Sequence, residues 1–349
     1  MMIQKAELVQ KLNKVKGVAF KKAPNPAMQG VLVKDGFLIA SNMEMTVKAK
    51  LGSPEGEIFI IPERAFDLIN NLPDGEVEIL ATAKDMITIK SASIKNRYQT
   101  VDPEQFPKMA GKEEGSELTI SARTLMESIR RVSYAIPIDR GNTVMASMCM
   151  QAVDGYLNFV GLDGHVLAWD RMDYDGEFEL LIPKNTVDKL KSLGLAGDVQ
   201  IRHGKNSAVF ITDDFEVYTR LVEGAYFKYQ NMFQGAALHT VISRDAMLDA
   251  MTRAKMCTEE RSPVKLVLDG SSLTLSIKDN ITDYQETVEL QEEMPEAFTI
   301  GFDARLVLET LKAFSCGNVR LSFSAPRMPM VVEAEGSDFK AVVLPVNLG

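Results

Sequence analysis

The sequence predicts an α+β protein built from three tandem copies of one unit, each with two helices and antiparallel sheets. A helical spacing of apolar residues opens each third of the 349-residue chain. A second helical pattern follows in every third, and the stretches between and after the helices alternate apolar and polar residues, as strands do. The composition, 46% apolar and 25% charged residues, is ordinary for a globular protein of several domains.

The first helix of each unit follows an isoleucine, at Ile3, Ile120 and Ile242. Counted from that residue, apolar side chains recur by threes and fours, which is the stripe of an amphipathic helix. Ser121 and Ser243 stand where an N-cap is expected. These patterns predict helices over 4–16, 121–133 and 243–255.

The second helix of each unit is predicted over 62–72, 183–193 and 303–313. Pro62 and Pro183 are expected at the first helical position of the first two copies. A glycine follows the last turn in every copy, as helix ends favour. These glycines are Gly75, Gly197 and Gly317.

Asp-Gly pairs at 35/36, 154/155 and 269/270 lie between alternating runs and predict hairpin turns. Polar, glycine-bearing stretches separate the units. The predicted domains are therefore 1–117, 118–238 and 239–349.

Several protein classes are disfavoured by the sequence. The start lacks the apolar core of a secretory signal, and no stretch is apolar enough to span a membrane, so we expect a cytoplasmic protein without a membrane partner. Three widely spaced cysteines fit neither a disulfide framework nor a zinc site. Catalytic motifs are missing too, and the sequence predicts no enzyme, no catalytic residues, no metal and no cofactor.

Local sequences in the three units match one known family. They include Asn25-Pro-Ala-Met28, the run from Leu162 to Ala168, the run from Cys316 to Leu321 and the tail from Val342 to Leu348. Their order and spacing resemble the bacterial DNA polymerase III beta subunit, the sliding clamp. The resemblance covers Ile3 to Leu348.

This resemblance implies a head-to-tail ring homodimer of six domains that encircles double-stranded DNA without reading its sequence. The ring would be a processivity factor of DNA replication. Its partners would be the DNA polymerase III alpha subunit, the clamp loader and other proteins with clamp-binding motifs. The alternative is a clamp-like scaffold that binds proteins without encircling DNA, and a hydrolase on an unrelated repeat fold is the least favoured hypothesis.

The resemblance also implies a peptide-binding pocket between the second and third domains. Val166, Phe227, Asn231 and Asn347 differ from residues common in the family, three of them where the family often has arginine, so the pocket is expected to be less basic. The implied pocket residues are Met145, Leu162, Gly164, His165, Val166, Leu167, Phe227, Asn231, Met232, Asn318, Val342, Val343, Leu344, Pro345, Val346, Asn347 and Leu348.

Taken alone, the net charge of −9 argues against a DNA partner, because phosphate binding needs clustered Lys and Arg. The six predicted helices, however, carry 16 Lys and Arg against 9 Asp and Glu, a charge of +7 that leaves −16 on the remainder. Helical geometry points Lys14, Arg123 and Arg130 away from the core and places Lys11 beside it. Lys21, Lys22 and Lys184 match family positions that meet DNA.

By the same resemblance, the dimer interface would join the surroundings of Tyr98 to those of Met256 and Cys257. A position in the core of the third unit fits Met256 and Cys257 equally well.

Overall fold

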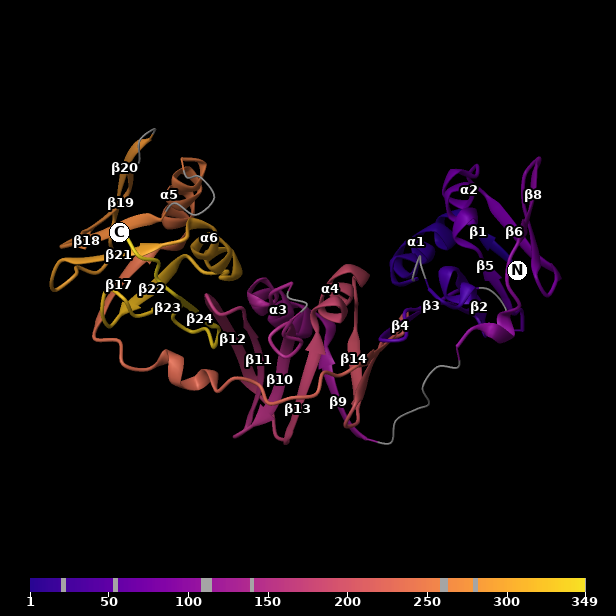
Figure 1. The fold of residues 1–349 in the computed structure, drawn as a ribbon, viewed down its shortest axis with the longest axis horizontal. Helices are drawn as coiled ribbons and strands as arrows, with labels where there is room; N and C mark the ends of the chain where they lie inside the picture. Colours follow the sequence, from indigo (N-terminus) through magenta and orange to yellow (C-terminus); the bar gives the residue numbers. More distant parts are fainter. Residues whose placement is uncertain are drawn as a thin grey trace. The chain divides into compact units, whose positions relative to one another are not determined.

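The computed structural model describes residues 1–19, 23–52, 56–107, 115–138, 141–257, 263–278 and 282–348. The chain divides into two compact units. Figure 1 shows the fold of the whole chain, coloured along the sequence. Unit 1 comprises Met1–Met126 and Asp188–Leu221, and unit 2 comprises Glu127–Val187 and Val222–Gly349. Each unit thus joins an outer repeat to part of the middle repeat. Within the described ranges, no helix is long and apolar enough to cross a membrane.

Unit 1 holds two antiparallel sheets. One has the strand order β1-β6-β7-β8 and the other β5-β2-β3-β4-β16-β15-β14-β9. The strands are β1 (Met2–Gln4), β2 (Val31–Lys34), β3 (Phe37–Ser41), β4 (Met45–Lys50), β5 (Phe59–Ile61), β6 (Glu76–Ala83), β7 (Met86–Ser91), β8 (Ile94–Gln99), β9 (Ser116–Ser121), β14 (Asp198–His203), β15 (Ser207–Ile211) and β16 (Phe215–Arg220).

Unit 2 repeats this plan with an eight-stranded sheet, β13-β10-β11-β12-β24-β23-β22-β17, and a four-stranded sheet, β20-β19-β18-β21. Its strands are β10 (Ser147–Val153), β11 (Tyr156–Leu162), β12 (Val166–Asp173), β13 (Phe178–Pro183), β17 (Leu238–Ser243), β18 (Val264–Asp269), β19 (Ser272–Lys278), β20 (Asp283–Glu289), β21 (Phe298–Phe302), β22 (Asn318–Phe323), β23 (Met330–Glu333) and β24 (Lys340–Val343).

Each eight-stranded sheet is two half-sheets from successive repeats, joined at one antiparallel strand pair. In unit 1 that pair is β4 with β16, called here the first seam, in which Thr46 is opposite Tyr218. In unit 2 it is β12 with β24, the second seam, in which Leu167 is opposite Val342. The sheets of neighbouring repeats are therefore continuous through the backbone.

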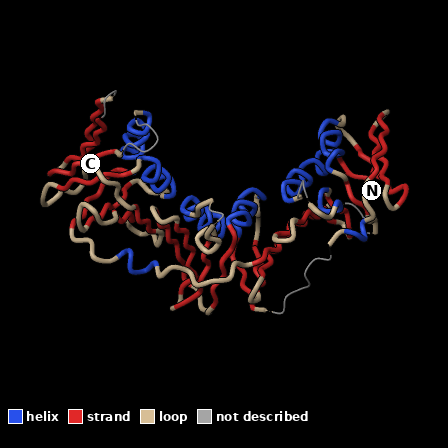
Figure 2. The backbone as a smooth tube through the Cα atoms, in the orientation of Figure 1, coloured by secondary structure: helices blue, strands red, loops and turns tan. Residues whose placement is uncertain are grey.

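The first-type helices form where the sequence predicts them, as α1 (Lys5–Val15), α3 (Ala122–Val132) and α5 (Arg244–Met256). In each of the two compact units the α-helices lie on one side of the strands (Figure 2). The apolar stripe of α1 is fully buried, which explains its spacing. Both predicted N-caps are confirmed, because Ser121 Oγ accepts from Thr124 N at 3.1 Å and Ser243 Oγ from Ala246 N at 3.3 Å.

The second-type helices are α2 (Phe66–Asn71), α4 (Lys184–Leu193) and α6 (Ala304–Ala313). The prediction that Pro62 and Pro183 occupy the first helical position is wrong. Pro62 has an extended ψ of 151° and precedes a 3-10 turn, η3 (Glu63–Ala65), which shortens α2. Pro183 ends strand β13. Each proline stops the incoming strand one residue before the helical backbone begins.

One backbone contact ties the two helices of every repeat together. Lys5 N, Ala122 N and Arg244 N, each the first amide of a first-type helix, donate to a glycine carbonyl oxygen at 2.8–2.9 Å. Those glycines are Gly75, Gly197 and Gly317, the same ones that follow the second-type helices. The repeat in the sequence is thus a repeat of hydrogen bonding.

The Asp-Gly hairpins are confirmed, with one difference. Asp35 and Gly36 have φ of 51° and 77°, and the pair at 154/155 has φ of 52° and 80°, as two-residue type I′ turns require. In the third hairpin Asp269 is still paired, opposite Ser272. That turn therefore consists of Gly270 and Ser271, one residue further along.

The remaining short elements are 3-10 turns. They are η1 (Lys16–Val18), η2 (Pro26–Gln29), η4 (Pro103–Gln105), η5 (Ser133–Ala135) and η6 (Tyr229–Phe233).

Candidate functional site

An apolar cavity of about 610 Å³ opens on unit 2 beside the second seam. Its size and largely apolar wall suit several buried side chains of a ligand. The lining residues are Asn142, Val144, Met145, Leu162, Gly164, His165, Val166, Leu167, Ala225, Phe227, Met232, Val342 and Leu344.

The floor of this pocket spans the second seam. Leu167 of β12 and Val342 of β24 face each other across it, and both belong to a buried cluster on that side of the sheet. Leu344 N donates to His165 O at 2.8 Å, which extends the pairing one step beyond β24. The floor is therefore part of one continuous hydrogen-bonded sheet.

One wall is the tight turn between β11 and β12. Asp163 Oδ1 accepts from His165 N and Val166 N, both at 2.8 Å. Gly164 has φ of 84°, a conformation that strains any residue with a Cβ. The turn thus holds His165 exposed at the rim.

The opposite walls are two loops. Asn142 starts the first one, and its Oδ1 accepts from Met145 N at 3.1 Å. The second is the segment 222–233, whose Tyr229 packs edge-on against Trp169 with ring centroids 5.3 Å apart. This anchor on the sheet leaves Phe227 at the pocket mouth, 51% exposed.

The structure brings ten of the seventeen predicted pocket residues together in the cavity lining. Asn142, Val144 and Ala225 also line it and were not predicted. The match between 142–145 and 25–28, both starting with Asn and ending with Met, was the signal that could have found the first two. The ten that agree are Met145, Leu162, Gly164, His165, Val166, Leu167, Phe227, Met232, Val342 and Leu344.

Seven predicted pocket residues lie outside the cavity lining. Val343 is buried in β24 between the floor residues, where alternation turns it to the other face. Val346 N donates to Gly301 O at 2.9 Å, and Leu348 contacts Gly301. The tail therefore leaves the pocket after Leu344. The others are Asn231, Asn318, Pro345 and Asn347.

Asn318 and Asn231 have surroundings of their own. Asn318 begins β22, and its Oδ1 accepts from Gln291 Nε2 at 3.0 Å. Asn231 lies exposed on η6, next to the lining residue Met232.

The first seam shows what makes the second one a pocket. Its turn has the same design, since Asn42 Oδ1 accepts from Glu44 N and Met45 N. Met43 takes the place of Gly164, with φ of 74°. Ser41 and Thr46, which correspond to Leu162 and Leu167, join their hydroxyl groups at 2.8 Å.

Further along the first seam, Lys48 and Glu216 form an ion pair at 2.6 Å. Polar side chains therefore stand at the first seam where Leu162, Leu167 and Trp169 stand at the second.

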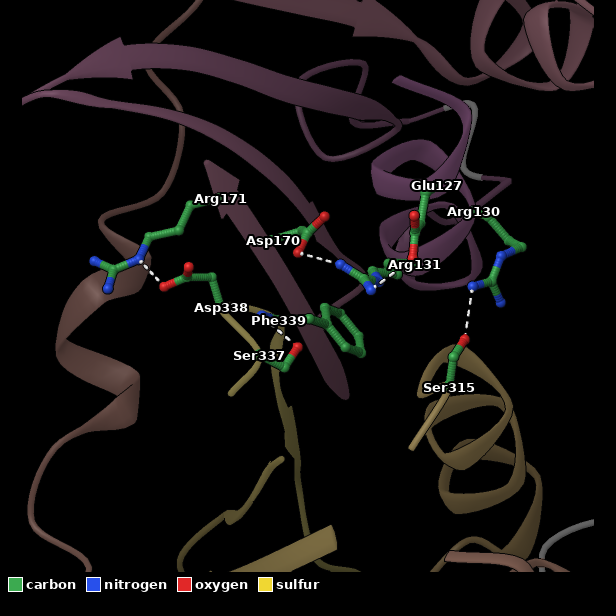
Figure 3. Close-up of polar contacts among 9 residues, drawn as sticks. All are labelled: Glu127, Arg130, Arg131, Asp170, Arg171, Ser315, Ser337, Asp338 and Phe339. Atoms are coloured by element: carbon green, nitrogen blue, oxygen red, sulfur yellow. Dashed lines mark hydrogen bonds and ion pairs between the residues drawn. The ribbon is translucent and has the colours of Figure 1, made fainter. Parts of the chain in front are cut away.

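A part-buried polar network lies on the other side of the second seam (Figure 3). Arg131 of α3 donates from Nη1 to Asp170 Oδ1 at 3.1 Å and from Nη2 to Glu127 Oε1 at 2.7 Å. Its guanidinium lies 5.8 Å from the ring centre of Phe339, just before β24. From the helix side of the sheet, Arg131 therefore contacts Asp170 of β12 and Phe339, the residue just before β24.

Asp170 is the most buried member of this network, with 3% of its side chain exposed. Burial raises the pKa of its carboxyl group, while hydrogen bonds from Ser128 and the positive charge of Arg131 oppose that rise. Outside the seam, Arg171 Nε donates to Asp338 Oδ1 at 3.0 Å, and Arg130 Nη2 to Ser315 Oγ at 3.2 Å. Arg171 therefore fastens β12 to the third repeat, and Arg130 fastens α3 to it. Ser128 and Arg131 of α3 are bound to Asp170 of β12.

The predicted DNA-binding residues have different surroundings. Arg123 is exposed on α3, whereas Lys14 Nζ donates to Ser192 O. Lys11 is only 14% exposed and pairs with Asp214 at 2.6 Å, so its ammonium group is already engaged.

Lys184 is half-buried at the start of α4. Lys21 and Lys22 fall outside the described residues.

The residues predicted for the dimer interface lie at two surfaces. Tyr98 is half-buried on β8, an edge strand, and its hydroxyl accepts from Asn96 Nδ2 at 3.2 Å. Met256 ends α5 with 80% of its surface exposed, and Cys257 follows it, half-buried. The exposure of Met256 argues against the alternative of a core position.

Comparison with known proteins agrees with this fold. The chain matches the N-terminal, central and C-terminal domain models of the DNA polymerase III beta subunit over 1–110, 119–228 and 234–347. It is 23% identical over 344 residues to the beta sliding clamp of Rickettsia bellii, covering 91% of each chain. To that of Proteus mirabilis it is 22% identical over 363 residues, covering 99% of each.

Solved structures show the same fold. The sliding clamp of Pseudomonas aeruginosa, solved with griselimycin, superposes with a TM-score of 0.93 at 22% identity, covering 100% of this chain and 99% of that one. The clamp of Bacillus subtilis gives 0.92 at 20% identity, covering 99% and 98%.

Three clamp domains in tandem, each with two helices and antiparallel sheets, define a DNA clamp. The chain belongs to the DNA polymerase III beta subunit family, and its function is that of a DNA sliding clamp.

Proposed function

We propose that two copies of this chain close head to tail into a ring that encircles duplex DNA and acts without catalysis. The observation that carries the proposal is the count of half-sheets. Each Asp-Gly hairpin consists of two strands, and the strand that follows it is β4, β12 or β20. β4 pairs with β16 and β12 pairs with β24, in each case the last strand of the next repeat. β20 has no such partner among the described strands, and neither has β8, the last strand of the first repeat.

Pairing β20 of one copy with β8 of the other would complete the third seam. Exposed sheet edges invite such pairing, and a head-to-tail contact that closes into a ring leaves neither β8 nor β20 unpaired. The two edges are also complementary in charge. β8 exposes Lys95 and Arg97, and β20 exposes Asp283 and Glu289.

Basic side chains on the helices support contact with DNA. The proposed contacts are those of Lys14, Arg123, Arg130 and Lys184, with Lys21 and Lys22, which precede β2 in the sequence. Lys11 is the weakest of the predicted set, because its ammonium group is paired. Contacts of this kind to phosphate groups carry no sequence information, as a sliding protein requires.

The pocket on unit 2 would tether partners by short peptides with apolar anchor side chains. The proposed partners are the replicative polymerase, meaning the DNA polymerase III alpha subunit, the clamp loader and other proteins with such motifs. Met145 and Met232 in the wall favour adaptability toward several peptides. We also propose that the three domains comprise residues 1–117, 118–238 and 239–349. A cytoplasmic location is proposed for the protein as well.

Retention on circular DNA tests the ring. After loading on a nicked circle by a clamp loader, the protein should stay bound through gel filtration and be lost when the DNA is cut. Equal retention on both forms would favour the scaffold that does not encircle DNA. Light scattering should give the mass of two chains.

The pocket is tested separately. Leu344→Ala should weaken binding of a polymerase peptide while the dimer stays intact. Unchanged peptide affinity in Leu344→Ala would refute the pocket assignment, because Leu344 lies in the lining.

A further inference from the structure

We propose that the pocket selects peptides whose apolar anchors are free of neighbouring carboxylates, so that neutral or basic segments bind and acidic ones are disfavoured. This inference rests on the proposed function of the pocket as a peptide site, and it names the chemical class of the partner. The charges on and near the lining carry it.

None of the thirteen described lining residues is Lys, Arg, Asp or Glu. The polar groups that the lining offers are the amide of Asn142, the imidazole of His165 and the backbone at Gly164. A carboxylate that enters such a cavity loses water and meets no fixed cation. Burial of an unpaired charge is costly, whereas an amide of the same shape needs only hydrogen bonds.

A negative group lies next to the lining, in the turn between β11 and β12, although it is not itself a lining residue. Asp163 lies in the turn beside the lining residues Gly164 and His165, and its carboxylate is held in place by two backbone amides at 2.8 Å. A second carboxylate bound beside this turn would add a like charge to a partly desolvated site, where like charges repel more strongly than in water.

The segment that forms the mouth does not offset this charge. Glu223 and Lys228 are both exposed on either side of Ala225 and Phe227, so their charges balance. The tail from Leu344 to Leu348 contains no ionisable side chain. In the turn, the mouth segment and the tail, the described charges are therefore neutral to acidic in sum.

The inference extends to the end of a peptide. A free C-terminal carboxylate directly after the last anchor would be disfavoured for the same reason as an aspartate. The partner segment is thus internal to its chain or continues for several residues beyond the anchors.

Three synthetic peptides test the proposal on the full chain. All carry the same Leu and Phe anchors. One has Asn between them and a C-terminal amide, one has Asp and an amide, and one has Asn and a free carboxylate after Phe. By isothermal titration calorimetry, the Asn amide should bind at least about threefold more tightly than either acidic peptide. The ratio should fall toward one between about 50 mM and about 500 mM NaCl, because salt screens charge repulsion.

A variant with a cation at the rim supplies the reciprocal test. His165→Arg should bring the affinity for the Asp peptide up to that for the Asn peptide. The matched control is Glu44→Gln, which raises the net charge by the same amount at the corresponding turn of the first seam and should leave the ratio unchanged.

Two outcomes would overturn the inference. Equal or tighter binding of the Asp peptide by the natural chain would refute charge selection while leaving the pocket as a peptide site. Failure of all three peptides to bind would refute the proposed pocket and this inference with it.

Discussion

Arg131 is the residue whose loss should most weaken the second seam. Arg131→Met keeps most of the side-chain volume but leaves the Asp170 carboxylate, 3% exposed, without its cation. Removing one partner of a buried ion pair costs about 3 to 5 kcal/mol. Because the Arg131 side chain is itself 22% exposed, we expect the lower end, about 3 kcal/mol.

In a unit of this size, about 3 kcal/mol lowers the melting temperature by about 6 to 12 °C. Differential scanning calorimetry of the full chain measures this shift. Asp170→Asn should cost less, because burial is the largest influence on the pKa of Asp170 and the amide removes the charge that burial disfavours. The double variant Arg131→Met with Asp170→Leu should melt close to the natural protein, since neither charge is left unpaired.

The dependence on pH gives a further check. The folded state raises the pKa of Asp170 above its ordinary value, so protonation of this carboxyl stabilises the fold at low pH, and that contribution is lost as pH rises through the folded pKa. Removing Arg131 raises this pKa further. The deficit of Arg131→Met should therefore be larger at about pH 8 than at about pH 5. A deficit below about 2 °C at both pH values, or an equal loss in Asp170→Asn, would refute the reasoning.

Three other outcomes follow from the seams and charges. Leu167→Thr gives the pocket floor the residue found at the first seam and should weaken peptide binding at least about tenfold, whereas Thr46→Val should not, as peptide titrations would show. The double variant Lys95→Glu, Arg97→Glu should shift the dimer toward single chains in sedimentation at low salt, and an unchanged dissociation constant would exclude charge pairing at β8. Arg123→Gln should lower the slope of log affinity for duplex DNA against log salt by about one.

The repeat made most of the fold predictable from the sequence. Helical stripes, N-caps and Asp-Gly turns are local patterns, and α1, α3 and α5 form where they were expected because their apolar stripes are fully or largely buried. The errors were local too. Periodicity does not distinguish a proline that starts a helix from one that ends a strand, as Pro183 does.

The pocket was predictable only in part. The sequence and its resemblance to a family identified the floor at Leu167 and Val342, but they did not show where the tail departs from the sheet. That point is fixed by the contact of Val346 with Gly301, between residues far apart in the chain. The Arg131–Asp170 pair was not predicted, because nothing in local spacing links α3 to β12.

The two seams also bear on how the chain reaches its native state. The Lys48–Glu216 pair of the first seam joins residues 168 positions apart, and the Arg171–Asp338 pair beside the second joins residues 167 apart. Closing such long loops is entropically costly, and contacts of high sequence separation form slowly. We expect hairpins and helices to assemble first and the seams last, so that competence to bind a partner peptide appears at the end of folding rather than with the first collapse.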